Sequence, residues 1–120
     1  MLVNRYGNKV KQELVTLASG NFNSNWEYLT INLNDDIANY RMLIVEYKRK
    51  DTKKGYFQIP VINGSIGERF NSTETESGSL RYIQMNVQNV KARSFEESLF
   101  SYVNKDSYEP LTITVIYGMQ

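Results

Sequence analysis

The sequence of 120 residues contains no cysteine and no histidine. Without cysteine there is no disulfide, no thiol nucleophile and no thiolate metal site. Without histidine there is no imidazole base, no Ser-His-Asp triad and no usual zinc site. An enzyme built on this sequence would depend on carboxylates, Tyr, Lys or Ser for its chemistry. We expect no bound metal and no cofactor.

An excess of one charge and long apolar runs are also missing. Fourteen basic and thirteen acidic residues give a net charge of +1, which is not the electrostatic signature of a nucleic-acid-binding protein. No stretch approaches the roughly 20 apolar residues of a membrane-spanning helix. We therefore expect no nucleic-acid partner and no membrane insertion. Hydrophobic residues at 41% and charged residues at 22% are typical of a single globular domain, which we place over residues 1–120.

The chain is rich in aromatic residues, with nine Tyr, five Phe and one Trp, and its periodicity predicts β-strands. Residues 80–90 show the longest alternation, which places Ile83, Met85 and Val87 on one face of a strand. The opposite face carries Tyr82, Gln84, Asn86 and Gln88. Residues 26–33 alternate in the same way. Such strands are typical of an antiparallel sheet with one buried face.

Further strands are predicted where apolar runs lie between turn residues. Residues 12–18 form a short strand that ends at a turn over residues 19–21, and residues 111–117 form the last strand. The segment 94–100 allows either a strand or one helical turn.

Three local features refine this pattern. Residues 41–49 read as a central strand, buried at its apolar end and solvated at the end that carries Glu46. Pro60 indicates an edge strand or a bulge, because proline cannot donate to a central ladder. Asn63 and Gly64 form a tight-turn dipeptide.

Two polar segments interrupt the strands. Residues 34–40 predict one short helical turn, with Asp35 or Asp36 as its N-cap and with Ile37 and Tyr40 packed beneath it. A calcium site at the two aspartates is the less favoured alternative, because no Asp-x-Asp-x-Asp-Gly loop accompanies them. Residues 68–79 have little apolar content and predict a mobile surface loop. The whole pattern predicts an all-β fold: an antiparallel, jelly-roll-like β-sandwich with one or two short helical turns.

Three segments, taken together, resemble a known family. They are LASGN at residues 17–21, NDDIANYRMLIVEY at residues 34–47 and ITVIYGM at residues 113–119. In this combination the chain is similar to the C-terminal β-sandwich domains of bacteriophage tail fibres and related receptor-binding proteins. The resemblance implies a non-catalytic virion protein on a phage tail or capsid surface. It also implies a homotrimer that contacts other virion proteins and recognises a host cell-surface polysaccharide.

Exposed aromatic and amide side chains are the candidate site residues. Flat aromatic rings can stack on the apolar face of a sugar, and nearby amides can bond its hydroxyl groups. The candidates are Trp26, Tyr28, Tyr56, Tyr82, Gln84 and Asn86. The alternative places several of these aromatic residues in the core or in a subunit interface, where Tyr and Trp are enriched.

Two other functions stay open. One is a purely architectural role in decorating a capsid or a tail. The other is a glycan hydrolase that would use the carboxylate pairs Glu96 and Glu97, or Glu74 and Glu76. Residues adjacent in sequence rarely flank a cleft as that chemistry requires, so we predict that the protein is not an enzyme. The basic group at residues 48–54 reads as a charged hairpin tip that protects a sheet edge, with contact to a phosphate polymer as the alternative.

Overall fold

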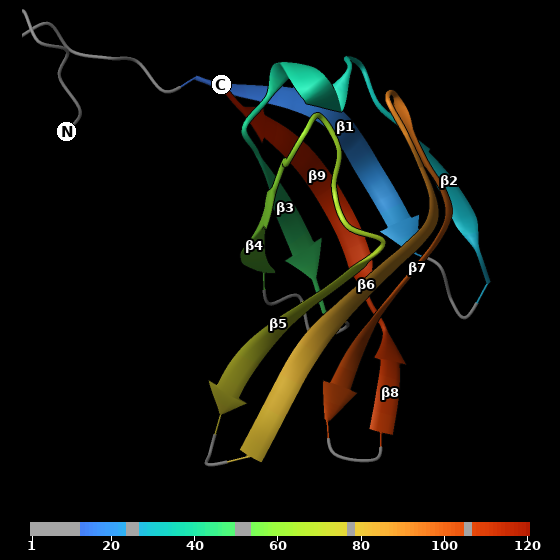
Figure 1. Cartoon of the computed structure of the whole chain (residues 1–120). Coiled ribbons are helices and arrows are strands. Elements are labelled where there is room, and N and C mark those ends of the chain that lie inside the picture. The colour runs from blue at the N-terminus through green and yellow to red at the C-terminus, as the bar shows by residue number, and fades with distance from the viewer. Residues whose placement is uncertain (1–12, 24–26, 50–53, 77–78, 105–106) are drawn as a thin grey trace, which may run out of the picture.

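The computed structural model describes residues 13–23, 27–49, 54–76, 79–104 and 107–120, and within these it describes all side chains except those of residues 72–76, 79–81, 104 and 107. This part of the chain contains nine strands and one short 3-10 turn (Figure 1). The strands are β1 (Leu14–Asn23), β2 (Leu29–Asn32), β3 (Met42–Lys48), β4 (Lys54–Pro60), β5 (Arg69–Glu76), β6 (Ser79–Lys91), β7 (Ser94–Asn104), β8 (Ser107–Pro110) and β9 (Thr112–Met119). The 3-10 turn, η1, spans Ile37–Asn39. No helix in the described ranges is long and apolar enough to span a membrane.

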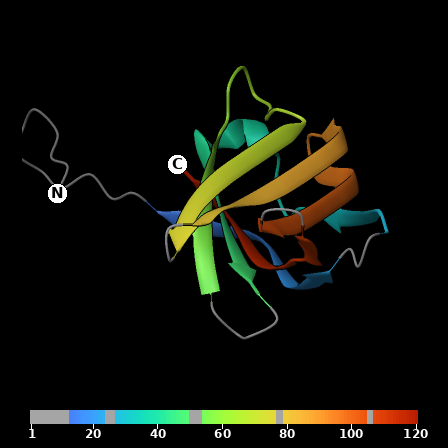
Figure 2. The same ribbon diagram turned by 90° about the horizontal axis from the view of Figure 1, so that it is seen from below.

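The strands form two antiparallel sheets that face each other (Figures 1 and 2). The first sheet has the order β1-β9-β3-β4, and the second has the order β2-β7-β6-β5. β8 also pairs with β7, at the opposite end of β7 from β2. The chain crosses between the sheets from β1 to β2 to β3, and its first and last described strands pair, as in a jelly roll. The predicted all-β sandwich is confirmed.

The core lies between the two sheets and is built from aliphatic and aromatic side chains of both. β6 contributes Ile83, Met85 and Val87, as its alternation predicts, while Tyr82, Gln84 and Asn86 on the other face are only partly buried. The largest side chains that are almost fully buried include Phe95, Phe100 and Tyr102 of β7 and Leu43 of β3.

The three segments that carry the family resemblance meet in the folded chain. The backbone N–H of Asn34 donates to the carbonyl oxygen of Leu17 over 2.7 Å. The Tyr40 hydroxyl donates to Oδ2 of Asp35 over 2.8 Å. The buried Tyr40 ring lies directly against Gly118, where a Cβ would stand 2.5 Å from ring atom Cδ1. These contacts are internal to the fold, so packing explains why the segments have these residues.

The helical turn at residues 34–40 is confirmed. Asp36 is its N-cap and accepts a hydrogen bond from the backbone N–H of Ala38 over 2.9 Å. Ile37 and Tyr40 are buried beneath the turn. Asp35 accepts from the backbone N–H of Asp36, from Asn39 and from Tyr40. The capping role predicted for these aspartates is therefore present at Asp36.

The tight turn and the edge strand are also confirmed. Asn63 and Gly64 both have positive φ values, 52° and 78°, as a two-residue hairpin turn requires. Ile62 and Ser65 exchange backbone hydrogen bonds across this turn. Pro60 is the last residue of β4, which is the edge strand of the first sheet.

The loop predicted over residues 68–79 is wrong, because residues 69–76 form the edge strand β5. β5 pairs with β6 from Arg69 to Glu76 without a register shift. Phe70 anchors it, since its ring stacks on that of Phe57 with centroids 4.9 Å apart. A polar edge strand needs few apolar side chains when a neighbouring strand supplies the ladder, and polar edges limit unwanted pairing.

Two further predictions need correction, and one open alternative is decided. β1 continues past the turn expected at residues 19–21 and reaches Asn23, with irregular register between Ser19 and Phe22. Residues 94–100 belong to strand β7 and not to a helical turn. The prediction that the strand end at Glu46 is solvated is wrong, because Glu46 is only 7% exposed.

Candidate functional site

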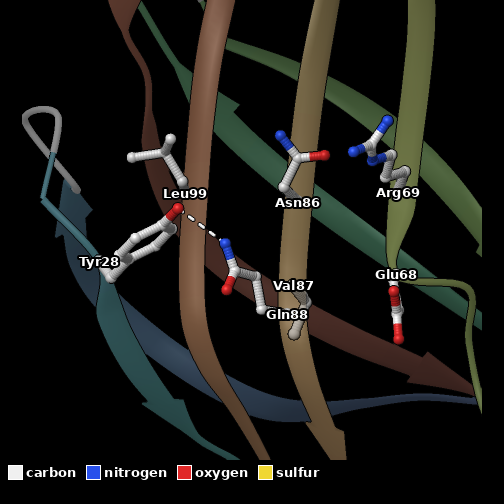
Figure 3. Close-up of a pocket in the computed structure, with 7 residues that line it drawn as sticks. All are labelled: Tyr28, Glu68, Arg69, Asn86, Val87, Gln88 and Leu99. Carbon is white, nitrogen blue, oxygen red and sulfur yellow. Dashed lines mark hydrogen bonds between the residues drawn. The ribbon is translucent and has the colours of Figure 1, made fainter.

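A polar hollow of about 460 Å³ opens on the outer face of the second sheet (Figure 3). Its lining residues come from β5, β6 and β7 and from the segments that precede β2 and β5. They are Tyr28, Glu68, Arg69, Asn86, Val87, Gln88 and Leu99. Strand register builds its centre, because Asn86 pairs with Arg69 on one side and with Leu99 on the other. Directly paired residues point to the same face of a sheet.

Tyr28 forms one wall of the hollow and is 57% exposed. Nε2 of Gln88 donates to the Tyr28 hydroxyl oxygen over 2.7 Å, and Figure 3 shows this bond crossing from β6 to the segment before β2. The bond fixes the ring while leaving much of its surface open to solvent. A positioned, exposed aromatic ring of this kind can stack on the apolar face of a ligand.

Asn86 lies at the centre of the hollow with an unused acceptor. Its Oδ1 atom is buried and has no hydrogen-bond partner in the described part of the chain. A buried carbonyl without a partner costs about 1 to 3 kcal/mol, and a ligand hydroxyl can recover part of this free energy only if the side chains that cover the atom move aside. In Figure 3 the Arg69 guanidinium points toward Asn86, whereas the Glu68 carboxylate points away from both. The centre therefore holds exposed donors of Arg69 beside a covered acceptor of Asn86.

The predicted site residues divide between the two sheets. Tyr28 and Asn86 line the hollow, and Tyr82 and Gln84 lie farther along the same face of β6. Tyr56 lies on the outer face of the first sheet, on the other side of the sandwich, and is 60% exposed. Trp26 falls outside the described residues.

Tyr56 belongs to a network around the buried Glu46. The Tyr56 hydroxyl donates to Oε2 of Glu46 over 2.8 Å, and the Thr114 hydroxyl donates to Oε1 over 2.8 Å. The bond from Thr114, followed by that from Tyr56, holds the pKa of Glu46 below its usual value despite desolvation, and the Lys54 charge adds to this. The hydrogen bond from Tyr56 to Glu46 also raises the pKa of Tyr56. Tyr56 thus stabilises a buried carboxylate and takes no part in the hollow.

Among the described carboxylates that were considered for hydrolysis, Glu96 has surroundings that do not suit acid catalysis. Glu96 forms an ion pair with Lys91 at 3.0 Å and accepts a hydrogen bond from Ser94. The Lys91 contact, and then the Ser94 bond, lower the pKa of Glu96, whereas a general acid needs a raised pKa. Glu97 is exposed, and the side chains of Glu74 and Glu76 lie outside the described set. Among the described residues no cluster of acidic side chains could hold a metal ion.

The structure describes only some residues of the basic hairpin tip at residues 48–54. Lys50 and Lys53 lie outside the described residues. Arg49 lies over the Tyr102 ring, with its guanidinium carbon 3.8 Å from the ring centroid. Lys54 lies 3.9 Å from Glu46. At least two of these cations therefore contact the body of the sandwich.

Sequence reasoning missed Arg69, Glu68, Gln88 and Leu99 as lining residues. Gln88 was placed on the correct face of its strand by the alternation, but nothing in the sequence indicated its bond to Tyr28. Arg69 and Glu68 were missed because their segment was predicted to be a loop. Only the register of β5 against β6 brings Arg69 beside Asn86. No known family model, curated protein or solved structure gives a significant match to the chain.

Proposed function

We propose that the protein is a non-catalytic structural module of a bacteriophage virion, a tail-fibre or receptor-binding tip that recognises glycans on the host surface. The resemblance of the three sequence segments supports the virion setting. The hollow supports glycan recognition, and one observation carries it: the exposed Tyr28 ring lies in the same hollow as the exposed polar side chains of Arg69 and Gln88.

A sugar matches this hollow in two respects. The apolar face of a pyranose ring can stack on Tyr28, whose orientation is fixed by Gln88. A sugar hydroxyl both donates and accepts, so it can accept from the exposed Arg69 guanidinium, and it can donate to Oδ1 of Asn86 once the side chains that cover this atom move aside. A purely apolar ligand would cover the exposed Arg69 guanidinium without bonding it, which costs affinity.

The Tyr28→Ala variant is expected to lose most glycan binding. The measurement is a glycan array of bacterial surface polysaccharides, followed by calorimetry with the polysaccharide that gives the strongest signal. Loss of the stacking ring and of the Gln88 bond should weaken binding by about tenfold, which corresponds to roughly 1.4 kcal/mol.

Tyr56→Ala is the matched control, because it removes a tyrosine of similar exposure from the opposite sheet. It should leave binding unchanged under conditions in which circular dichroism shows both variants folded. Equal losses in the two variants would place the site elsewhere. Absence of binding to every glycan at millimolar sugar would favour the architectural role in a capsid or tail.

The proposal includes a homotrimer, as the resemblance implies. Individual sugar contacts are weak, and three hollows presented together raise the effective affinity because the later contacts become intramolecular. Light scattering that gives the mass of a single chain at micromolar concentration would remove this part of the proposal.

A further inference from the structure

We propose that the glycan is a linear polysaccharide that lies lengthwise along β6 and contacts the protein well beyond the hollow. This inference rests on the proposed function. It adds that the protein binds the interior sugars of a chain and not a terminal sugar. The reason is that the outer face of the second sheet continues the chemistry of the hollow, row by row, toward the end of β6 that lies beside the β7–β8 pair.

The first row beyond the hollow is mostly polar. Gln84 pairs with Asn71 on β5 and with Ser101 on β7, and Ser101 pairs with Pro110 on β8. Gln84 is only partly buried, and Asn71 is exposed. This row places two amide side chains next to the centre of the hollow, where they can bond sugar hydroxyls.

The second row returns to aromatic residues. Tyr82 pairs with Val103, and Val103 pairs with Tyr108, so the three side chains share the outer face. Tyr108 is 56% exposed and Tyr82 is partly buried, whereas Val103 between them is buried and does not belong to the main core. Two tyrosines therefore flank a buried aliphatic residue, which gives a second stacking surface.

The two aromatic surfaces are too far apart for one sugar. Tyr82 and Gln88 are six positions apart on β6, and at about 3.4 Å per residue they are separated by roughly 20 Å along the strand. Tyr28 adjoins Gln88 at one end, and Tyr108 lies beside the row of Tyr82 at the other. A ligand that uses both ends must span several sugar rings. The amides of Gln84 and Asn86 lie between the ends, where the interior sugars would pass.

The charges of this surface favour hydroxyl-rich chains over polyanions. Ionised phosphate, sulfate or carboxylate groups only accept hydrogen bonds, so they cannot donate to the amide oxygens of Gln84 and Asn71 on this surface. Arg69 would attract an anion, but the adjacent Glu68 carboxylate in the same hollow opposes it. We therefore expect sugars that carry free hydroxyl groups in this part of the site.

The test uses a size series of one polysaccharide. The probe is the polysaccharide with the strongest array signal, cut to lengths from disaccharide to octasaccharide, and binding is measured by calorimetry. Affinity should rise about tenfold or more from the disaccharide to the longest chain that still gains contacts, and then level off.

Variants at the two ends separate this inference from the proposed function. Tyr108→Ala should weaken octasaccharide binding by about tenfold and leave disaccharide binding unchanged, and Gln84→Ala should do the same to a smaller extent. Tyr28→Ala should weaken both lengths, and Tyr56→Ala should weaken neither. Because Gln84 points outward, its replacement keeps the test valid even if Tyr108→Ala fails to fold.

Three outcomes contradict the inference. Equal affinity for the disaccharide and the octasaccharide would show that the ligand is a single terminal sugar, with the proposed function intact. An unchanged octasaccharide affinity in both Tyr108→Ala and Gln84→Ala would show that longer chains gain contacts elsewhere. Absence of binding at every length would overturn the inference and the proposed function together.

Discussion

Gly118→Ala is expected to lower the free energy of unfolding by about 2 to 3 kcal/mol, the upper part of the range for overpacked cores. The new Cβ would stand 2.5 Å from Cδ1 of the Tyr40 ring. That ring is 5% exposed, and its hydroxyl donates to Asp35, so it cannot move aside without losing the bond. Urea denaturation of the variant and of the native protein measures the difference.

Gly67→Ala is the matched control for this variant. A Cβ at Gly67 meets its nearest atom, the Arg69 carbonyl oxygen, at 3.8 Å, which is an ordinary contact. The control should therefore stay close to the native stability. Tyr40→Leu should partly rescue Gly118→Ala, since the smaller side chain leaves room for the methyl group, and the double variant should be more stable than the sum of single effects indicates. Strict additivity would show that the ring is not the obstacle.

Glu46→Ala is expected to destabilise the protein by about 2 to 4 kcal/mol at neutral pH, because it removes two hydrogen bonds to a buried carboxylate. The variant removes the carboxylate to which the Tyr56 and Thr114 hydroxyl groups donate, so Thr114 keeps only its 3.2 Å bond to the Glu46 carbonyl oxygen and the exposed Tyr56 must donate to water. Glu68→Ala removes an exposed carboxylate and should change stability by no more than about 0.5 kcal/mol.

The same network predicts how stability depends on pH. The folded state holds the pKa of Glu46 below the ordinary value of 4.5, so its contribution is fully present above pH 4.5 and is lost as the pH falls through the lowered pKa. The Glu46→Gln variant cannot titrate at this position, so its free energy of unfolding should fall less steeply over that acid range. Parallel acid curves for the native protein and the variant would mean that Glu46 is not held ionised by the fold.

Local sequence patterns predicted the features that depend on neighbouring residues. The alternation of β6 fixed which side chains face the core, and the Asn63–Gly64 dipeptide specified its turn through positive φ values. Asp36 was a correct N-cap because the capping bond reaches only two residues along the chain. In each case the interaction that decides the structure is local.

Features that depend on distant residues were missed. Glu46 lies on β3 between β9 and β4, and Thr114, 68 positions away on β9, bonds to it, so no local pattern contains the information that it is buried. The polar strand β5 exists because β6 supplies its ladder and Phe57 packs against Phe70. The candidate site could be predicted only in part for the same reason. The sequence pointed to Tyr28 and Asn86, but the bond from Gln88 and the position of Arg69 depend on sheet pairing.

An NMR titration with the array-selected polysaccharide locates the bound sugar on the protein. The largest shift changes are expected at the side-chain amides of Asn86, Gln88 and Gln84, with the backbone of β6 following and the first sheet unaffected. Shift changes confined to the β1-β9-β3-β4 sheet, or none at saturating sugar, would contradict this expectation.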